Sequence, residues 1–110
     1  MPRFTYVVLS HAKAGQEEEF VKWYEEQHMV DVLKFPEVVS AKLHRCDFQR
    51  VYDLEPPKYT CITIYEIEGD DPETIVNKLR DASGSAAMPE TTTLDKEGMI
   101  QAVGTLIAEG

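Results

Sequence analysis

The chain has 110 residues, which fits one domain, and we expect residues 1–110 to form a single unit. Its 20 acidic residues outnumber the 11 basic ones, so the formal net charge is −9. This charge argues against a nucleic-acid partner and against anionic membrane surfaces, because both need clustered Lys and Arg. No apolar run approaches the roughly 18 residues of a membrane span, and the start lacks the apolar stretch of a signal peptide. We therefore expect a cytoplasmic protein.

The first predicted strand is Phe4–Ser10, which is rich in β-branched and aromatic residues and apolar on both faces. A turn follows, and then a helix that runs to about His28. A short helical extension, Met29–Lys34, ends before Pro36, which cannot continue a helix. Four residues recur at helical spacing and define the predicted inward face of the helix: Phe20, Trp23, Tyr24 and Gln27.

Two long strands joined by a polar loop predict an antiparallel hairpin. The first is Glu37–Arg50, in which apolar and polar residues alternate, and the second is Lys58–Glu68. The alternation in the second strand places five residues on one face: Tyr59, Cys61, Thr63, Tyr65 and Ile67. The loop between the strands spans residues 51–57.

A second helix begins after Gly69, with Asp71 as its N-cap and Pro72 at its first position. The segment Ala82–Asp95 is rich in Ser, Thr, Ala and Gly, and we expect it to be a loop that serves as a mobile lid. The last predicted strand is Met99–Ile107, again apolar on both faces.

The predicted order is β-α-β-β-α-β, a ferredoxin-like α+β fold with a four-stranded antiparallel sheet. Right-handed crossovers place both helices on one face of this sheet. The opposite face is then uncovered, although the first and last strands are apolar on both sides. An exposed apolar face of several hundred Å² is a liability, and we expect a homodimer to form through it. The alternative is a monomer whose long loops fold over the sheet.

The stretch Phe20–Leu43 resembles the EthD-like branch of the dimeric α+β barrel superfamily. The matching positions are Trp23-Tyr24, His28, Asp31, Leu33, Pro36 and Val38-Val39-Ser40-Ala41. The resemblance implies a dimer whose sheets close into a barrel with the helices outside, and a ligand pocket between sheet and helices in each subunit. The wider superfamily includes cofactor-free monooxygenases, polyketide cyclases, lactone isomerases and haem enzymes, and the fold does not choose among them.

The candidate catalytic residues are His28, Tyr24 and Asp31. His28 lies four residues after Tyr24 and three before Asp31, so all three can share one helix face. A carboxylate can orient an imidazole and a phenol can share a proton with it, which suits acid–base chemistry near neutral pH. The structural alternative is that His28 bonds a backbone carbonyl at the end of the helix.

Five further residues are candidate ligand-binding residues. Trp23, Tyr6 and Tyr65 could stack on a flat ligand, although a role in the core is the alternative. His11 ends the first strand, at the sheet edge where pockets often open. His44 has the strand parity of residues that face the expected dimer interface, where a structural histidine is the favoured alternative.

We expect a small apolar organic ligand, no metal and no cofactor. The sequence contains no GxxxxGK[ST], GxGxxG, HExxH or GxSxG motif. One hypothesis is an enzyme with acid–base chemistry, as an isomerase, lyase or cyclase, or a cofactor-free oxygenase. The second is a non-catalytic binding or accessory protein, and the third is a haem protein with a histidine ligand.

Overall fold

The computed structural model describes residues 1–110, and it has the predicted β-α-β-β-α-β order. The four strands form one antiparallel sheet in the order β2-β3-β1-β4. The strands are β1 (Arg3–Ala12), β2 (Val38–Arg45), β3 (Cys61–Glu68) and β4 (Leu94–Gly104). The helices are α1 (Glu17–Trp23), α2 (Met29–Val32) and α3 (Pro72–Ala82), and a π-helical segment, Tyr24–His28, joins α1 to α2.

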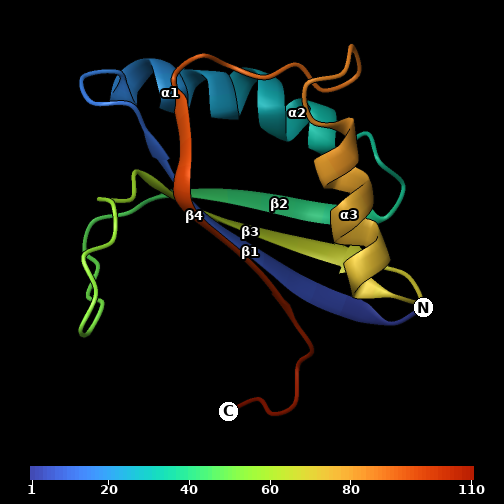
Figure 1. The fold of residues 1–110 in the computed structure, drawn as a ribbon. Coiled ribbons are helices and arrows are strands. Elements are labelled where there is room, and N and C mark those ends of the chain that lie inside the picture. Colours follow the sequence, from blue (N-terminus) through green and yellow to red (C-terminus); the bar gives the residue numbers. More distant parts are fainter.

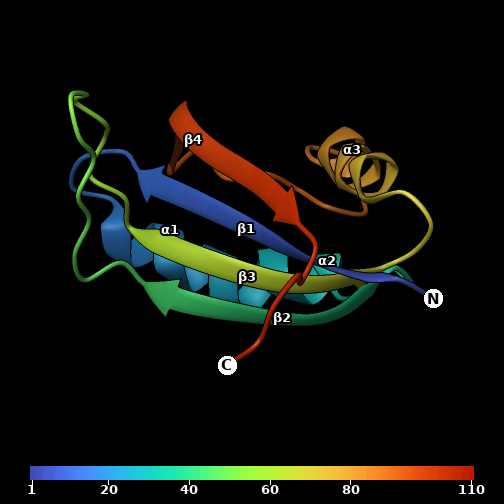
Figure 2. The ribbon, with the colours of Figure 1, turned by 90° about the horizontal axis from the view of Figure 1, so that it is seen from below.

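The helices lie on one side of the sheet, as the crossover rule predicts (Figure 1). Seen from below, the strands lie in front of α1 and α2, and no helix covers the face turned to the viewer (Figure 2). The predicted ferredoxin-like α+β fold is therefore confirmed. None of the helices has both the length and the apolar character needed to cross a membrane.

The core lies between the sheet and the helices. Strand alternation turns Tyr6 and Val8 of β1, and Tyr65 and Ile67 of β3, toward the helices, where all four are buried. They pack with residues of α2, α3 and the following segment: Val32, Ile75, Leu79 and Met88. A second buried cluster forms at the other end of the sheet from Ala12, Phe20, Tyr24 and Cys61.

The predicted hairpin strands are shorter in the structure. β2 ends at Arg45 rather than Arg50, and β3 begins at Cys61 rather than Lys58. The reason is the side chain of Gln49, whose Nε2 donates to Pro57 O (2.8 Å) and whose Oε1 accepts from Tyr59 N (2.7 Å). This amide replaces strand-to-strand bonds and fixes the base of a longer loop.

The other two strands differ from the prediction as well. β1 continues to Ala12, so His11 lies within the strand rather than at its end. β4 begins at Leu94, inside the segment expected to be a loop, and it ends at Gly104 rather than Ile107. Leu106 and Ile107 are consequently exposed beyond the sheet.

The first helix contains a feature that helical spacing did not predict. The predicted helix and its extension are continuous, but Tyr24–His28 is π-helical, and Met29 N donates to Tyr24 O five residues earlier. This wide turn changes which residues share a face. Gln27 is therefore exposed, not inward-facing as predicted, and its side chain donates to Asp31.

The start of α3 is as predicted. Pro72 occupies the first turn, and Asp71 is the N-cap, with its side chain accepting from Glu73 N (3.2 Å) and from Thr74 Oγ1 (2.7 Å). These bonds satisfy donors that the helix leaves free at its start. α3 is thereby held at the sheet end where Ile75 and Leu79 enter the core.

The sheet face opposite the helices is apolar along β1, β3 and β4, while β2 contributes Ser40, Lys42 and His44 to it. Val7 and Leu9 of β1 lie beside Ile64 and Ile62 of β3, and Leu9 also pairs with Ile100 of β4. None of these five side chains is fully buried in the isolated chain. We call these five residues, with Ala102, the open face.

Candidate functional site

A cavity of about 600 Å³ lies between the sheet and the helices, and most of its 18 lining residues are hydrophobic. The sheet contributes Tyr6, Val8, Ser10 and Tyr65, and the first helical region contributes Phe20, Trp23, Tyr24, His28 and Val32. The other side is formed by α3, the segment after it and β4, through residues that include Leu79, Arg80, Met88, Glu90 and Lys96. The volume is in the range that holds small organic ligands.

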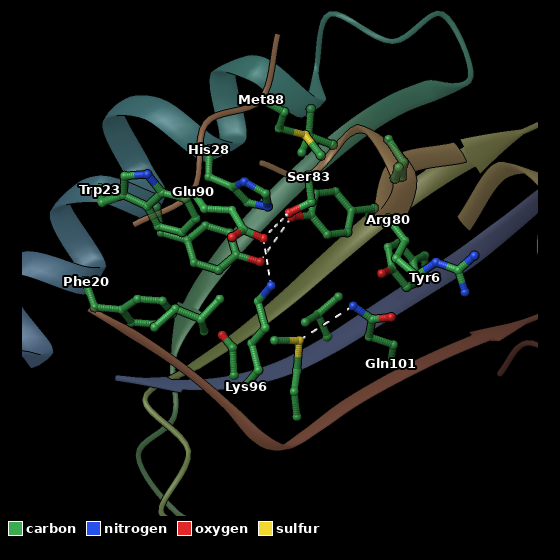
Figure 3. Close-up of a pocket in the computed structure, with 18 residues that line it drawn as sticks. Tyr6, Phe20, Trp23, His28, Arg80, Ser83, Met88, Glu90, Lys96 and Gln101 are labelled. Carbon is green, nitrogen blue, oxygen red and sulfur yellow. Dashed lines mark hydrogen bonds and ion pairs between the residues drawn. The ribbon is translucent and has the colours of Figure 1, made fainter. Parts of the chain in front are cut away.

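The π-helical turn places His28 against two aromatic rings. Residues five apart lie over one another in such a turn, so the His28 ring stacks on Trp23, with centroids 4.8 Å apart and planes at 23°. The edge of Tyr24 meets the same imidazole at 5.0 Å and 90°. His28 points into the cavity from this aromatic wall (Figure 3).

The imidazole of His28 is neutral at pH 7. Burial lowers the pKa of His28 to about 4, although the carboxylates of Asp31 and Glu90 oppose the shift. Its Nδ1 is buried and has no hydrogen-bond partner, so the structural alternative, a bond to a backbone carbonyl, is not formed through this atom. Because Nδ1 is closed off, it is the rest of the imidazole that faces the cavity.

Three tyrosine side chains line the same space. The hydroxyls of Tyr24 and Tyr65 are hydrogen-bonded at 3.1 Å, and the ring of Tyr6 stacks on Tyr65 with centroids 5.4 Å apart. Burial raises the pKa of Tyr6 to about 12, and it also raises the pKa of Tyr24 and of Tyr65. All three are protonated phenols at neutral pH, able to donate a hydrogen bond.

The polar side of the cavity is formed by a cluster of one hydroxyl and two charged side chains, Ser83, Glu90 and Lys96 (Figure 3). Lys96 Nζ lies 2.7 Å from Glu90 Oε1, and Ser83 Oγ donates to the same oxygen at 3.0 Å. These bonds lower the pKa of Glu90. They also link the segment between α3 and β4 to β4 itself, across one side of the cavity.

The structure brings together five of the eight residues singled out from the sequence. His28, Tyr24, Trp23, Tyr6 and Tyr65 all line the cavity, and they come from the first helical region and the two central strands. The inward helix face predicted Trp23 and Tyr24, and strand alternation accounts for Tyr6 and Tyr65, whereas the π-helical turn places His28.

The other three residues lie outside the cavity lining. Asp31 is buried but accepts from Gln27 Nε2 (2.7 Å) and pairs with Lys34 (3.5 Å), so the expected bond to His28 is not formed. His11 Nε2 donates to Glu97 O at 2.6 Å, beside the ring of Tyr59. His44 is exposed on β2, and its Nδ1 lies 3.3 Å from Ile62 O.

Several polar lining residues were not singled out from the sequence, among them Ser10, Arg80, Glu90 and Lys96. Ser10 carried a usable signal, because it has the same strand parity as Tyr6 and Val8. Its hydroxyl is buried without a hydrogen-bond partner, as is that of Thr63. No group of three or more His, Cys, Asp or Glu side chains is clustered as a metal ion would require.

No protein-family model matches the sequence, and no curated protein matches it either. Solved structures do resemble the chain. A Shewanella loihica protein provisionally named a monooxygenase is 18% identical, with a TM-score of 0.61 over 98% of this chain and 97% of its own. An ethyl tert-butyl ether D (EthD) family protein from Bacillus halodurans is 17% identical, with a TM-score of 0.60 over 94% of this chain and 99% of its own. The chain thus has the α+β fold of EthD-like proteins that its sequence resemblance implied, and at these identities the likeness shows the fold alone.

Proposed function

We propose that the protein is a small enzyme that performs acid–base chemistry on a small, largely apolar organic molecule held in the cavity. The observation that carries this proposal is the neutral His28, whose imidazole stacks on Trp23 at the wall of an aromatic cavity of about 600 Å³. A perturbed titratable group beside a cavity is typical of catalytic sites.

In this proposal His28 is the acid or base, and Tyr24 positions the substrate or shares its proton. Trp23, Tyr6 and Tyr65 hold a flat substrate by stacking and apolar contact. Asp31 acts on His28 through its charge rather than through a bond, because its oxygens are held by Gln27 and Lys34. His11 and His44 are not part of the proposed site.

The reaction would be an isomerase, lyase or cyclase step, each of which begins when a base removes a proton. Cofactor-free oxygenation is the variant suggested by the name of the Shewanella protein. It would begin in the same way, since the substrate itself must supply electrons to dioxygen after it has lost a proton. The same residues therefore serve either outcome.

The second candidate is a non-catalytic binding protein that uses the same cavity. It is favoured by the low pKa of His28, because an imidazole whose pKa is about 4 is a weak base at neutral pH. Binding and catalysis predict different results when His28 is replaced.

Trp23 is the only tryptophan of the chain and lies in the cavity wall, so its fluorescence reports ligand binding directly. A panel of flat apolar acids, ketones, lactones and phenols should be screened by this signal. Each ligand that binds is then incubated with the wild type and analysed for products. We expect His28→Ala to abolish turnover, by about a hundredfold or more, while the matched control His44→Ala retains it.

Fully active His28→Ala would contradict the catalytic proposal. Ligands that bind but are never converted would support the non-catalytic alternative instead. The circular dichroism spectra of His28→Ala and His44→Ala should match that of the wild type, because misfolding alone would abolish turnover.

We also propose that the chain is one domain that forms a homodimer through the open face. The support is the row of apolar side chains on Val7, Leu9, Ile62, Ile64 and Ile100, which no element of the chain covers. Two such faces packed together would remove this surface from water.

A further inference from the structure

The two hydrogen-bonded phenols of the cavity have one proton more than their mutual bond uses. Tyr24 and Tyr65 are both protonated, and the 3.1 Å contact between their hydroxyls needs a single donor. The hydroxyl that accepts in this bond keeps its own proton. Both phenols line the cavity, so that proton can be offered to a molecule held there.

Tyr24 is the phenol of this pair that lies beside His28. Either hydroxyl can be the donor within the pair. With Tyr65 as that donor, Tyr24 is polarised by it and keeps its own proton for a molecule in the cavity.

The free donor lies beside the proposed base. The imidazole of His28 meets the edge of the Tyr24 ring at 5.0 Å, and both residues line the cavity. No bond to the buried Nδ1 fixes the tautomer of His28, so Nδ1 can hold the ring proton and leave Nε2 as the acceptor. A phenol and an imidazole therefore line one small space from the same helical turn.

We infer that the substrate is a flat carbonyl compound with a C–H bond next to the carbonyl, and that Tyr24, polarised by Tyr65, binds its oxygen while His28 removes the proton. This inference rests on the proposed function and names its substrate class. The C–H bond breaks, its electron pair forms a C=C bond, and the carbonyl π electrons move to oxygen, giving an enolate. The proton passes to His28; where the substrate has a C=C bond between its β and γ carbons, the proton returns to the γ carbon and the double bond moves into conjugation, so isomerisation needs no oxidant or co-reactant.

Electrostatics support the step. A donor held in place beforehand stabilises a developing oxyanion more than water does, since it needs no reorganisation. The carboxylates of Asp31 and Glu90 would stabilise the imidazolium that forms at the same time. The stacked rings of Tyr6 and Tyr65 offer a flat wall for the conjugated enolate.

The first test uses 4-nitrophenol, whose phenolate is a flat delocalised oxyanion, and 4-nitroanisole, which has the same ring without an ionisable oxygen. Affinities are measured by isothermal titration calorimetry, and the form of bound nitrophenol is read from its visible phenolate absorbance. We expect the wild type to bind the phenolate and to lower the apparent pKa of the probe. We expect Tyr24→Phe to weaken this binding about tenfold or more, while 4-nitroanisole binds both proteins alike.

Tyr65→Phe separates a positioning role from a structural one. It leaves the Tyr24 hydroxyl in place but removes its polarising donor, so we expect a smaller loss, about threefold, and a partial return of the probe pKa toward its value in water. The control is Tyr52→Phe, which removes a phenol hydroxyl from the exposed loop between β2 and β3 and should change nothing.

The second test measures the step itself. Exchange of hydrogen for deuterium next to the carbonyl of 2-tetralone is followed by NMR in D₂O. We expect exchange above the buffer rate with the wild type, none above it with His28→Ala, and about a tenfold or larger decrease with Tyr24→Phe.

The outcomes separate this inference from the proposal on which it rests. If 4-nitrophenol binds the wild type as the neutral phenol, or binds Tyr24→Phe as tightly as the wild type, the phenol pair is not an oxyanion site. The cavity would still be a ligand site in that case. Exchange at the buffer rate overturns the carbonyl substrate class. Failure of both probes to bind the wild type overturns the inference and the proposed site together.

Discussion

His28 is surrounded by groups that act on its charge in opposite directions. Burial against Trp23 and Tyr24 disfavours the imidazolium, while Asp31 and Glu90 favour it, and burial dominates. The result is a histidine whose pKa is about 4 in the folded chain, against 6.5 for an unperturbed side chain. His28 therefore binds a proton less readily in the folded protein than in the unfolded chain.

This difference predicts how stability depends on pH. Between pH 6.5 and pH 4 the unfolded chain binds a proton at His28 and the folded chain does not, so stability falls as the pH falls through this range. The loss attributable to His28 should total about 3 kcal/mol. Urea unfolding at pH 7 and pH 4 should therefore show a shallower pH dependence for His28→Gln than for the wild type. Equal pH dependence in the two proteins would contradict the buried neutral state, and His44→Gln is the exposed control.

At the scale of elements, the segment between α3 and β4 lines one side of the cavity. Met88 anchors it in the core, and Glu90 ties it to Lys96 of β4. The Glu90–Lys96 pair is largely exposed, so it contributes little to global stability. Its effect should be on access to the cavity, because Ser83, Glu90 and Lys96 all lie at the lining.

We expect Glu90→Gln to raise the dissociation rate of a cavity ligand severalfold while it changes the free energy of unfolding by less than about 1 kcal/mol. High salt should have the same effect on the wild type, since it screens the exposed pair. Stopped-flow fluorescence of Trp23 measures the rate. Glu37→Gln is the matched control, because Glu37 and Lys78 form an exposed pair at the same 2.7 Å away from the cavity lining. An unchanged rate in Glu90→Gln would show that this pair does not close the site.

The elements differ in how far the sequence could predict them. Strand alternation, the Asp71-Pro72 start of α3 and the chirality rule fixed the order and the layers, because each depends on local patterns. The π-helical turn carries no residue signature of its own, so the stacking of His28 on Trp23 and the separation of His28 from Asp31 were not predictable from helical spacing. Glu90 and Lys96 reach the cavity through tertiary packing of a segment without periodicity, which is why they were missed.

At the scale of the whole molecule, the two sides of the sheet differ. One side has the helices, the core and the cavity, and the other has the open face, from which the loop between β2 and β3 and the C-terminal residues extend (Figure 1). Leu106 and Ile107 are exposed there, as are Phe48 and Tyr52 of the loop. An apolar sheet bordered by apolar extensions is the surface that a second copy of the chain would cover.

A charge at the centre of this face tests the proposed dimer. Ile64 lies on β3 between Val7 and Lys42, so a lysine there would have to be buried, unpaired, in a dimer but would remain in water in a monomer. We expect the wild type to sediment as a dimer, and Ile64→Lys to weaken association at least tenfold without loss of the fold. Val30→Lys, on an exposed apolar residue of α2 on the helix side, should leave the dimer intact. A wild type that sediments as a monomer at all concentrations would contradict the dimer, and the loop and C-terminal residues would then be the only parts of the chain able to shield the open face.

Because the cavity lies on the helix side, its ligand affinity should be the same in the Ile64→Lys monomer as in the wild type, which would show that each protomer holds a complete site.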